Sequence, residues 1–249
     1  MLNYIKSELY RSKRNGVLLS VFIGCLMILG AVVLVLHHYV NDPDFGYSNT
    51  RYALSNIYMQ LSMVYVFTIV FAMAYFGNED RDHTLKHTVA FGIKRSTIYI
   101  GRLITTELIC IVGYIILCSC FTGLSFLLLN HSNAGEIGNL IKVSLYCLPC
   151  LMFGIAITHT LILLFDNMGV SIGLAAGFIY ILPLILNTLG RKIVIIHKMS
   201  YFLPYNLVSY DGPAAQMNGN EWHATVIGLG WLCITIVAGI LLYQKKEIK

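Results

Sequence analysis

Charged residues are scarce in this chain. Only 12% of its 249 residues are charged, against about 25% in ordinary soluble domains. Hydrophobic residues make up 57% of the chain, and its mean hydropathy is +0.71. A composition this apolar argues against a water-soluble domain.

Sequence patterns for catalysis and nucleotide binding are also missing. The chain has no H-E-x-x-H and no G-x-S-x-G, and "GIKRST" at 92–97 lacks the first glycine and the preceding strand of a phosphate-binding loop. Cys147 and Cys150 have C-x-x-C spacing, but they lie inside an apolar run, which favours an ordinary helix over a redox site. We therefore expect no catalytic residue, metal or cofactor in this chain, and any energy source would come from a partner.

Long apolar runs are what the sequence has instead. A helix needs about 20 apolar residues to span a bilayer, and six runs reach that length. They cover about 17–37, 54–76, 98–129, 141–165, 169–189 and 222–243. These runs predict an all-α polytopic membrane protein, with six transmembrane helices in one domain, 1–249, and both termini on the same side.

Lys and Arg are distributed unevenly between the two sides of these spans. Twelve of the 17 fall on the side of the termini: Lys6, Arg11, Lys13, Arg14, Arg81, Lys86, Lys94, Arg95, Arg102, Lys245, Lys246 and Lys249. Because cytoplasmic loops carry the excess of Lys and Arg, we expect a cell-membrane protein with cytoplasmic termini. The positive net charge then requires no nucleic acid partner.

Two segments outside the spans are partly apolar. Residues 1–16 place Leu2, Ile5 and Leu9 on one helical face, which predicts an interfacial helix. The stretch 190–221 is long and only partly polar. We expect it to form an outer loop that is partly re-entrant, with protein covering its backbone.

Three glycines, Gly169, Gly173 and Gly177, recur at every fourth position at the start of the fifth run. Small residues at this spacing let two helix backbones approach closely. They predict a packing face, directed either at a helix of the same chain or at a second membrane subunit.

Two ionisable residues lie within the spans at similar predicted depth, Glu107 in the third and His159 in the fourth. Polar side chains at such depth usually face the bundle interior. One interpretation is a polar pair near the substrate route or the energy input. The other is local satisfaction, of His159 by a backbone carbonyl and of Glu107 by extension towards the interface.

The longest charged interruption, 76–103, separates the second and third spans. Asp82 is placed to cap a short helix over 83–90. Leu85 and Val89 would then share one face of that helix, which suits docking into a groove of a partner, with Arg95 among the cations at the border of the contact.

This stretch resembles the permeases of the ATP-binding-cassette type-2 exporter family. In those permeases a glutamate follows the second span, then a short helix, and a basic residue precedes the third span. The residues in corresponding positions are Glu79, Thr84, Leu85, Arg95 and Arg102. The chain departs from the pattern at His83 and Gly92, where glycine and proline are common. The resemblance extends over essentially the whole chain.

The resemblance implies a function and a set of partners. It implies a coupling helix within 78–95, separate ABC ATPase subunits that bind ATP and Mg²⁺, and a second permease subunit, identical or homologous. ATPase closure would change the access of a cavity lined by the second and fifth spans. The chain looks most like bacterial permeases that export peptides, including those giving immunity to lantibiotics or bacteriocins, with an amphipathic peptide or another lipid-partitioning substrate. An intramembrane enzyme using Glu107, His159 and Asp166, or a membrane sensor or scaffold, is the alternative.

Overall fold

Helices make up most of the computed structural model, which describes residues 2–42, 44–76, 92–132, 135–165, 167–209 and 220–246. The described residues form no sheet; only Asn49 and Asn130 make an isolated bridge. The elements are α1 (Leu2–Lys13), α2 (Gly16–His38), α3 (Thr50–Met59), η1 (Leu61–Met63), α4 (Val64–Phe76), α7 (Arg95–Leu128), α8 (Gly135–Leu164), α9 (Met168–Ala176), η2 (Gly177–Ile181), α10 (Leu182–Gly190), α11 (Val194–Ser200), α12 (Pro204–Leu207) and α14 (Trp222–Lys245).

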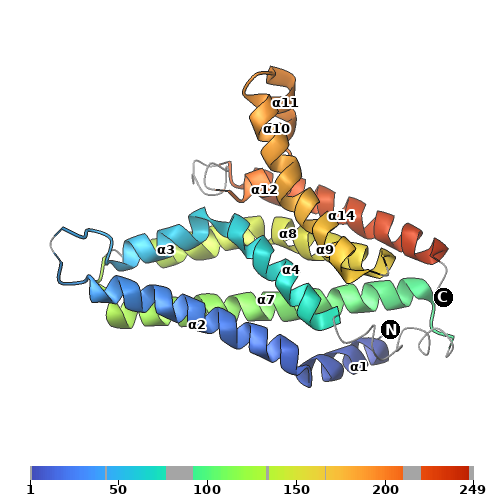
Figure 1. Cartoon of the computed structure of the whole chain (residues 1–249), viewed down its shortest axis with the longest axis horizontal. Helices are drawn as coiled ribbons and strands as arrows, with labels where there is room; N and C mark the ends of the chain where they lie inside the picture. The colour runs from blue at the N-terminus through green and yellow to red at the C-terminus, as the bar shows by residue number, and fades with distance from the viewer. Residues whose placement is uncertain are drawn as a thin grey trace.

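The predicted all-α membrane fold is confirmed. Five helices are long and apolar enough to cross a membrane: α2, α7, α8, the α9–α10 helix and α14. The bent pair of α3 with η1 and α4 passes the same test when taken together, and it raises the number to six if it crosses as one span. Both chain termini lie at the same end of the bundle (Figure 1), as an even number of spans requires.

The second span is not the single helix that the run 54–76 predicts. α3 ends at Met59, Gln60 leaves helical geometry with φ −117° and ψ 37°, and the helix axis bends by 59° before α4. No proline lies in this span. The bend is therefore imposed by contacts from elsewhere in the chain.

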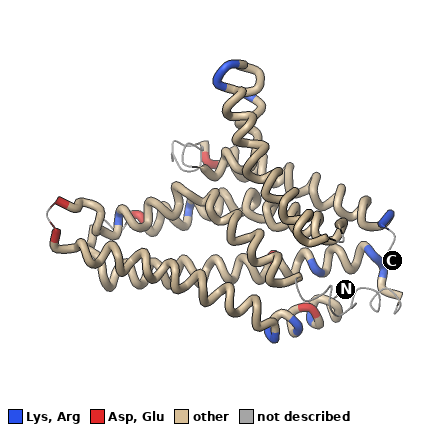
Figure 2. The backbone as a smooth tube through the Cα atoms, viewed as in Figure 1, with Lys and Arg blue, Asp and Glu red and all other residues tan. Residues whose placement is uncertain are grey.

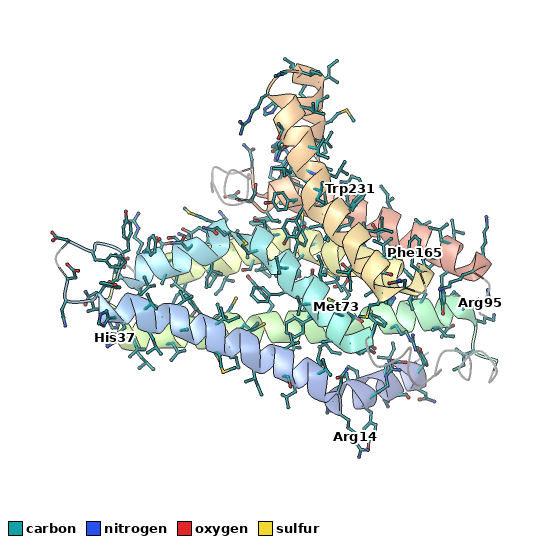
Figure 3. All side chains as sticks on the ribbon, in the orientation of Figure 1. Arg14, His37, Met73, Arg95, Phe165 and Trp231 are labelled. Carbon is teal, nitrogen blue, oxygen red and sulfur yellow. The ribbon has the colours of Figure 1, made fainter. Side chains whose placement is uncertain are left out.

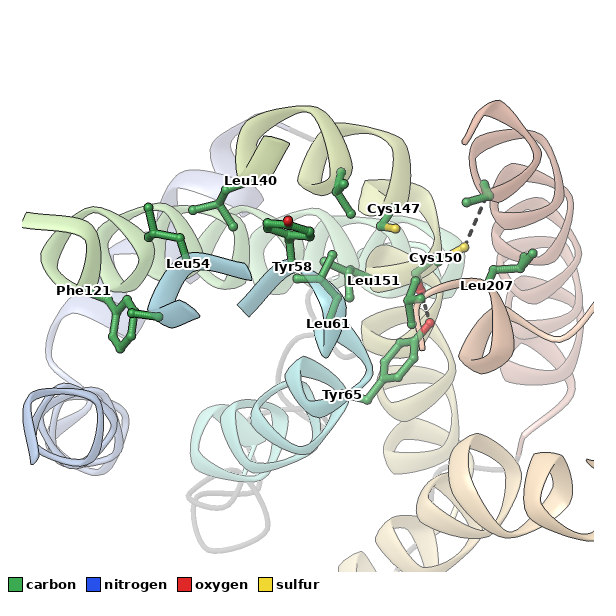
Figure 4. Packing of buried hydrophobic residues seen from close by; sticks show 14 of the residues in the cluster. Leu54, Tyr58, Leu61, Tyr65, Phe121, Leu140, Cys147, Cys150, Leu151 and Leu207 are labelled. Carbon is green, nitrogen blue, oxygen red and sulfur yellow. Dashed lines mark hydrogen bonds between the residues drawn. The ribbon is translucent and has the colours of Figure 1, made fainter. Parts of the chain in front are cut away.

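α8 is the central helix of the bundle. In its most apolar stretch 67% of the residues are buried, against 17–22% in the other unbent spans. Gly154 of α8 packs against the ring of Tyr65, whose hydroxyl donates to the carbonyl oxygen of Cys150 at 2.9 Å (Figure 4). On its other side Gly228 of α14 approaches the backbone of Cys150. Close approach and hydrogen bonds of this kind hold helices together in lipid, where apolar burial gives little drive.

The remaining spans present apolar side chains outwards. Met27 of α2, Ile115 of α7 and Ile234 of α14 are 66%, 56% and 63% exposed. Such surfaces suit contact with lipid tails.

α1 forms within the predicted segment 1–16 and lies at an angle to α2 (Figure 1). Asn15 makes the corner between the two helices. Its Oδ1 accepts from the N–H groups of Val17 and Leu18, and its Nδ2 donates to the carbonyl oxygen of Ala74 at 2.8 Å. The corner is thus fixed to the end of α4, and the place of α1 at the membrane surface stays a prediction.

The fifth span leads into a helical hairpin. After the π-helical turn η2, α10 projects from the bundle and α11 turns back along it (Figure 1). Gly190 permits the return, since a Cβ there would lie 3.0 Å from the Cα of His197. The predicted outer loop 190–221 thus contains α11 and α12, and residues 210–219 lie outside the described ranges.

Candidate functional site

A cavity of about 620 Å³ lies between the first three spans. Its volume falls within the range of about 300–1,000 Å³ that is usual for small-molecule sites. Val32 of α2, Phe67 and Phe71 of α4 and Phe121 of α7 are among its walls. None of the described lining residues is Asp, Glu, Lys or Arg, so the cavity suits the apolar part of a ligand.

The lining of this cavity differs from that of the predicted cavity between the second and fifth spans, which stays a prediction. Residues of α3 and α4 line it as expected for the second span, but no residue of the fifth span does. α2 and α7 supply the other walls. The fifth span instead runs away from the bundle towards its projecting hairpin (Figure 1).

Two carboxamides lie on the cavity wall at the bend, Asn56 and Gln60. The Nδ2 of Asn56 donates to the carbonyl oxygen of Tyr52 at 2.9 Å. The Nε2 of Gln60 lies 3.4 Å from the Oδ1 of Asn56, which is long for a hydrogen bond. The bend therefore brings a weakly engaged amide to an otherwise apolar cavity.

Contacts from outside the second span hold the bend. The N–H of Ser62 donates to the carbonyl oxygen of Val208 at 3.2 Å, and the hydroxyl of Tyr180 donates to the carbonyl oxygen of Ser62 at 3.1 Å. A broken helix inside a membrane needs such partners, since no water is available to its backbone. The bend is thus linked to η2 and to the segment after α12.

A buried polar cluster joins α1 to the spans near the termini. Glu8 of α1 accepts from the hydroxyl of Tyr75 at 2.8 Å and pairs with Arg11 at 2.5 Å. The Nε of Arg102 lies 3.6 Å from Glu8 and donates to the hydroxyl of Tyr4 at 2.9 Å. Burial raises the pKa of Tyr4 above its usual range, and the positive charge of Arg102 only partly opposes this shift. Tyr4 therefore stays neutral.

Arg95 joins the start of the third span to the end of the sixth. Its guanidinium donates to the carbonyl oxygens of Gln244, at 3.0 Å, and of Lys246. The Nζ of Lys246 in turn donates to the carbonyl oxygen of Leu163 at 3.0 Å. Gly92, at φ +79°, makes the turn into α7, a conformation that favours glycine. Figure 3 shows Arg95 at the end that carries the termini, opposite His37.

The other predicted coupling residues lie outside the described ranges. These are Glu79, Asp82, Thr84, Leu85 and Val89. The helix over 83–90 and the coupling role of these residues stay predictions.

The predicted glycine face has no helix of the described chain packed against it. A Cβ at Gly173 or Gly177 would meet nothing within 4 Å, and one at Gly169 would meet only the side chain of Asn167, at 3.2 Å. The same-chain alternative thus finds no support among the described residues. The close backbone approach that sequence reasoning missed is at Gly228, which Ala224, four residues earlier, could have marked as small residues at helical spacing.

Glu107 and His159 are both buried, at 6% and 0% exposure. Within the part of the chain that the structure describes, neither side chain has a hydrogen-bond partner. His159 packs instead against the rings of Tyr99 and Phe76, with centroids 5.1 and 5.3 Å away. Among the described residues, neither the backbone carbonyl expected for His159 nor a direct bond between the two side chains is found, and the role of the pair stays a prediction. Asp166 lies outside the described ranges.

Comparison with known families decides what kind of protein this is. A family model described as ABC-2 family transporter protein matches residues 4–184. The chain belongs to the ABC-2 transporter family. The ABC-2 match includes the residues of the cavity, the Glu8 cluster and Arg95. A search of curated proteins gives no match. ABC-2 membership indicates a membrane-spanning transporter subunit rather than an enzyme, and it implies ABC ATPase subunits as partners.

Proposed function

We propose that this chain is the permease subunit of an ATP-driven exporter that moves amphipathic peptides or other lipid-partitioning molecules out of a bacterial membrane or cytoplasm. Membership in the ABC-2 family supports the transporter role. The cavity at the bend of the second span is the basis for this choice of substrate, because its described walls are mostly apolar and carry no charged side chain. Its substrate would enter from lipid more readily than from water.

Coupling to the ATPase subunits takes place through the segment 78–95. Two observations support this route. Arg95 bonds the end of α14, and Lys246 bonds the end of α8. Arg102, two turns further along α7, pairs with Glu8 of α1. A push on 78–95 is therefore delivered to several spans at once and tilts them together.

A second permease subunit, identical or homologous, completes the transporter. The open glycine face at Gly173 supports a contact between subunits, because a helix of the second subunit could approach the backbone there without meeting a side chain. Both termini and the 78–95 segment face the cytoplasm in this proposal. Figure 2 shows Lys and Arg at the end of the bundle that carries the termini, as the positive-inside rule expects.

Co-purification with an ATPase tests the proposal. The tagged full-length chain is purified from its native host, bound ATPase subunits are identified, and peptide-stimulated ATP hydrolysis is measured in vesicles. Replacing Leu85 and Val89 together by aspartate is expected to leave insertion intact while association and transport are lost.

The matched control replaces His83 and His87 by aspartate. These residues also lie four apart, on the opposite face of the proposed helix, and both activities are expected to survive. Unchanged association and transport in a correctly inserted Leu85 and Val89 double variant would contradict the docking site. A chain that binds peptide but changes no ATPase would instead be a sensor.

A further inference from the structure

The cavity between the first three spans excludes charge. Its described lining contains no ionised side chain, so a charged ligand group inside it would lose its hydration without gaining a partner. Only the uncharged part of a ligand fits there. What distinguishes one uncharged ligand from another is then the hydrogen bonding that the walls offer.

Two of the hydroxyl groups that reach the cavity are already engaged. The hydroxyls of Tyr114 and Ser144 lie 2.8 Å apart, and the hydroxyl of Thr68 donates to the carbonyl oxygen of Tyr65 at 2.8 Å. The Thr68 hydroxyl can therefore serve a ligand only as an acceptor unless its bond is broken, and one of the two protons of the Tyr114–Ser144 pair is already used between them.

The carboxamide of Gln60 differs from these hydroxyls. A carboxamide has two N–H donors and one carbonyl acceptor with two lone pairs. The one contact found for it among the described residues is the 3.4 Å contact of its Nε2 with Asn56. The Oε1 and the second N–H therefore remain available on the cavity wall.

The bend places this amide where a ligand can reach it. Gln60 sits at the break between α3 and η1, and the contacts of Ser62 with Val208 and Tyr180 fix the chain there. The amide is thus presented by a braced backbone, which is the arrangement that gives specificity in a site.

We infer that Gln60, supported by Asn56, is the specificity-determining residue of the cavity and that it recognises a secondary amide carried on an uncharged aliphatic chain. The N–H of the ligand amide donates to the Oε1 of Gln60, a bond that an ester of the same shape cannot form. The aliphatic chain lies against Phe67, Phe71 and Phe121. This inference rests on the proposed transport of lipid-partitioning molecules.

Photo-crosslinking of the purified full chain in lipid nanodiscs tests the inference without any ATPase. The probe is a dodecanamide with an N-alkyl diazirine, and the matched probe is the ester of the same length, which lacks the N–H. One hydrogen bond corresponds to a difference of roughly two- to tenfold. The amide is expected to reach half-saturation at a concentration lower than the ester by that factor, with adducts on cavity-lining residues.

Two variants refine the test. Gln60→Leu keeps the size of the side chain and is expected to remove the preference for amide over ester. Met63→Leu changes an exposed apolar residue of the same lining, and this variant is expected to keep the preference for amide over ester. Should Gln60→Leu fail to fold, the comparison of the two probes on the natural chain decides alone.

Equal half-saturation of amide and ester in the natural chain would overturn the inference, as would an unchanged preference in folded Gln60→Leu. Adducts outside the cavity would show that the probe does not bind there, and displacement of both probes alike by phospholipid would show that the cavity merely holds lipid chains; either result would overturn the inference. Selective amide binding in a chain that stimulates no ATPase would leave this inference standing and refute the proposed function instead.

Discussion

Gly228→Ala tests how the sixth span is held against the central one. A Cβ at Gly228 would lie 2.8 Å from the backbone nitrogen of Cys150 and 3.1 Å from the carbonyl carbon of Pro149. Backbone atoms cannot rotate aside as the end of a long side chain can. α14 must therefore move away from α8 along their contact.

The expected cost follows from two opposing effects. Overpacking of this kind costs about 1–3 kcal/mol, whereas alanine in a helix is about 1 kcal/mol more favourable than glycine. Gly230→Ala, on the same helix, brings only the second effect, because nothing lies within 4 Å of its new Cβ. The difference between the two variants thus isolates the contact and is expected to be about 1–3 kcal/mol.

Thermal unfolding in one detergent, followed by circular dichroism at 222 nm, measures this difference. For a chain of this size each kcal/mol corresponds to about 2–4 °C in Tm, so Gly228→Ala is expected to melt roughly 2–12 °C below Gly230→Ala. Equal melting temperatures would show that the α14 backbone does not need to approach α8 closely, and the packing account would be refuted.

Three other predictions concern the cluster, the glycine face and the topology. Glu8→Leu is expected to destabilise the chain more than Arg102→Leu in the same assay, because Glu8 keeps its ion pair with Arg11 when Arg102 is removed, whereas removal of Glu8 takes the shared acceptor from Tyr75, Arg11 and Arg102. The double variant is expected to cost less than the sum of the two; additive losses would contradict the pair. Gly173→Ile is expected to leave the melting of the single chain unchanged but to abolish cross-linking between permease subunits, with Gly173→Ala mild; full assembly would remove the packing role. Single cysteines at Asn78 and Gln244 should label only from the cytoplasm, and those at Asn133 and Asn218 only from outside; outside labelling at Asn78 would reverse the orientation.

The bend at Gln60 illustrates what sequence reasoning cannot reach. The run 54–76 has the length and hydropathy of one straight helix, and it contains no proline to predict a break. The break depends on Val208 and Tyr180, which supply hydrogen bonds to Ser62 from far along the chain. The cavity and its amide follow from that break, so neither was predictable.

The pairing of Glu8 with Arg102 was likewise not predictable from the sequence. Both residues were visible as charges near the ends of apolar segments, but nothing in their spacing joins them. Only the packing of α1 against α7, where Gly101 faces the ring of Tyr4, brings the two charges together.

The helical class and the presence of five to six apolar helices long enough to cross a membrane were determined by the sequence alone. Each depends on a local quantity, the length of an apolar run measured against a bilayer. Which glycines allow close approach, and where the second span bends, were decided by the tertiary structure. In lipid every helix face is apolar, so composition does not distinguish a face that packs from one that meets lipid. That distinction arises only from the shape of the neighbouring helix, as Gly228 against Cys150 and the open face at Gly173 demonstrate.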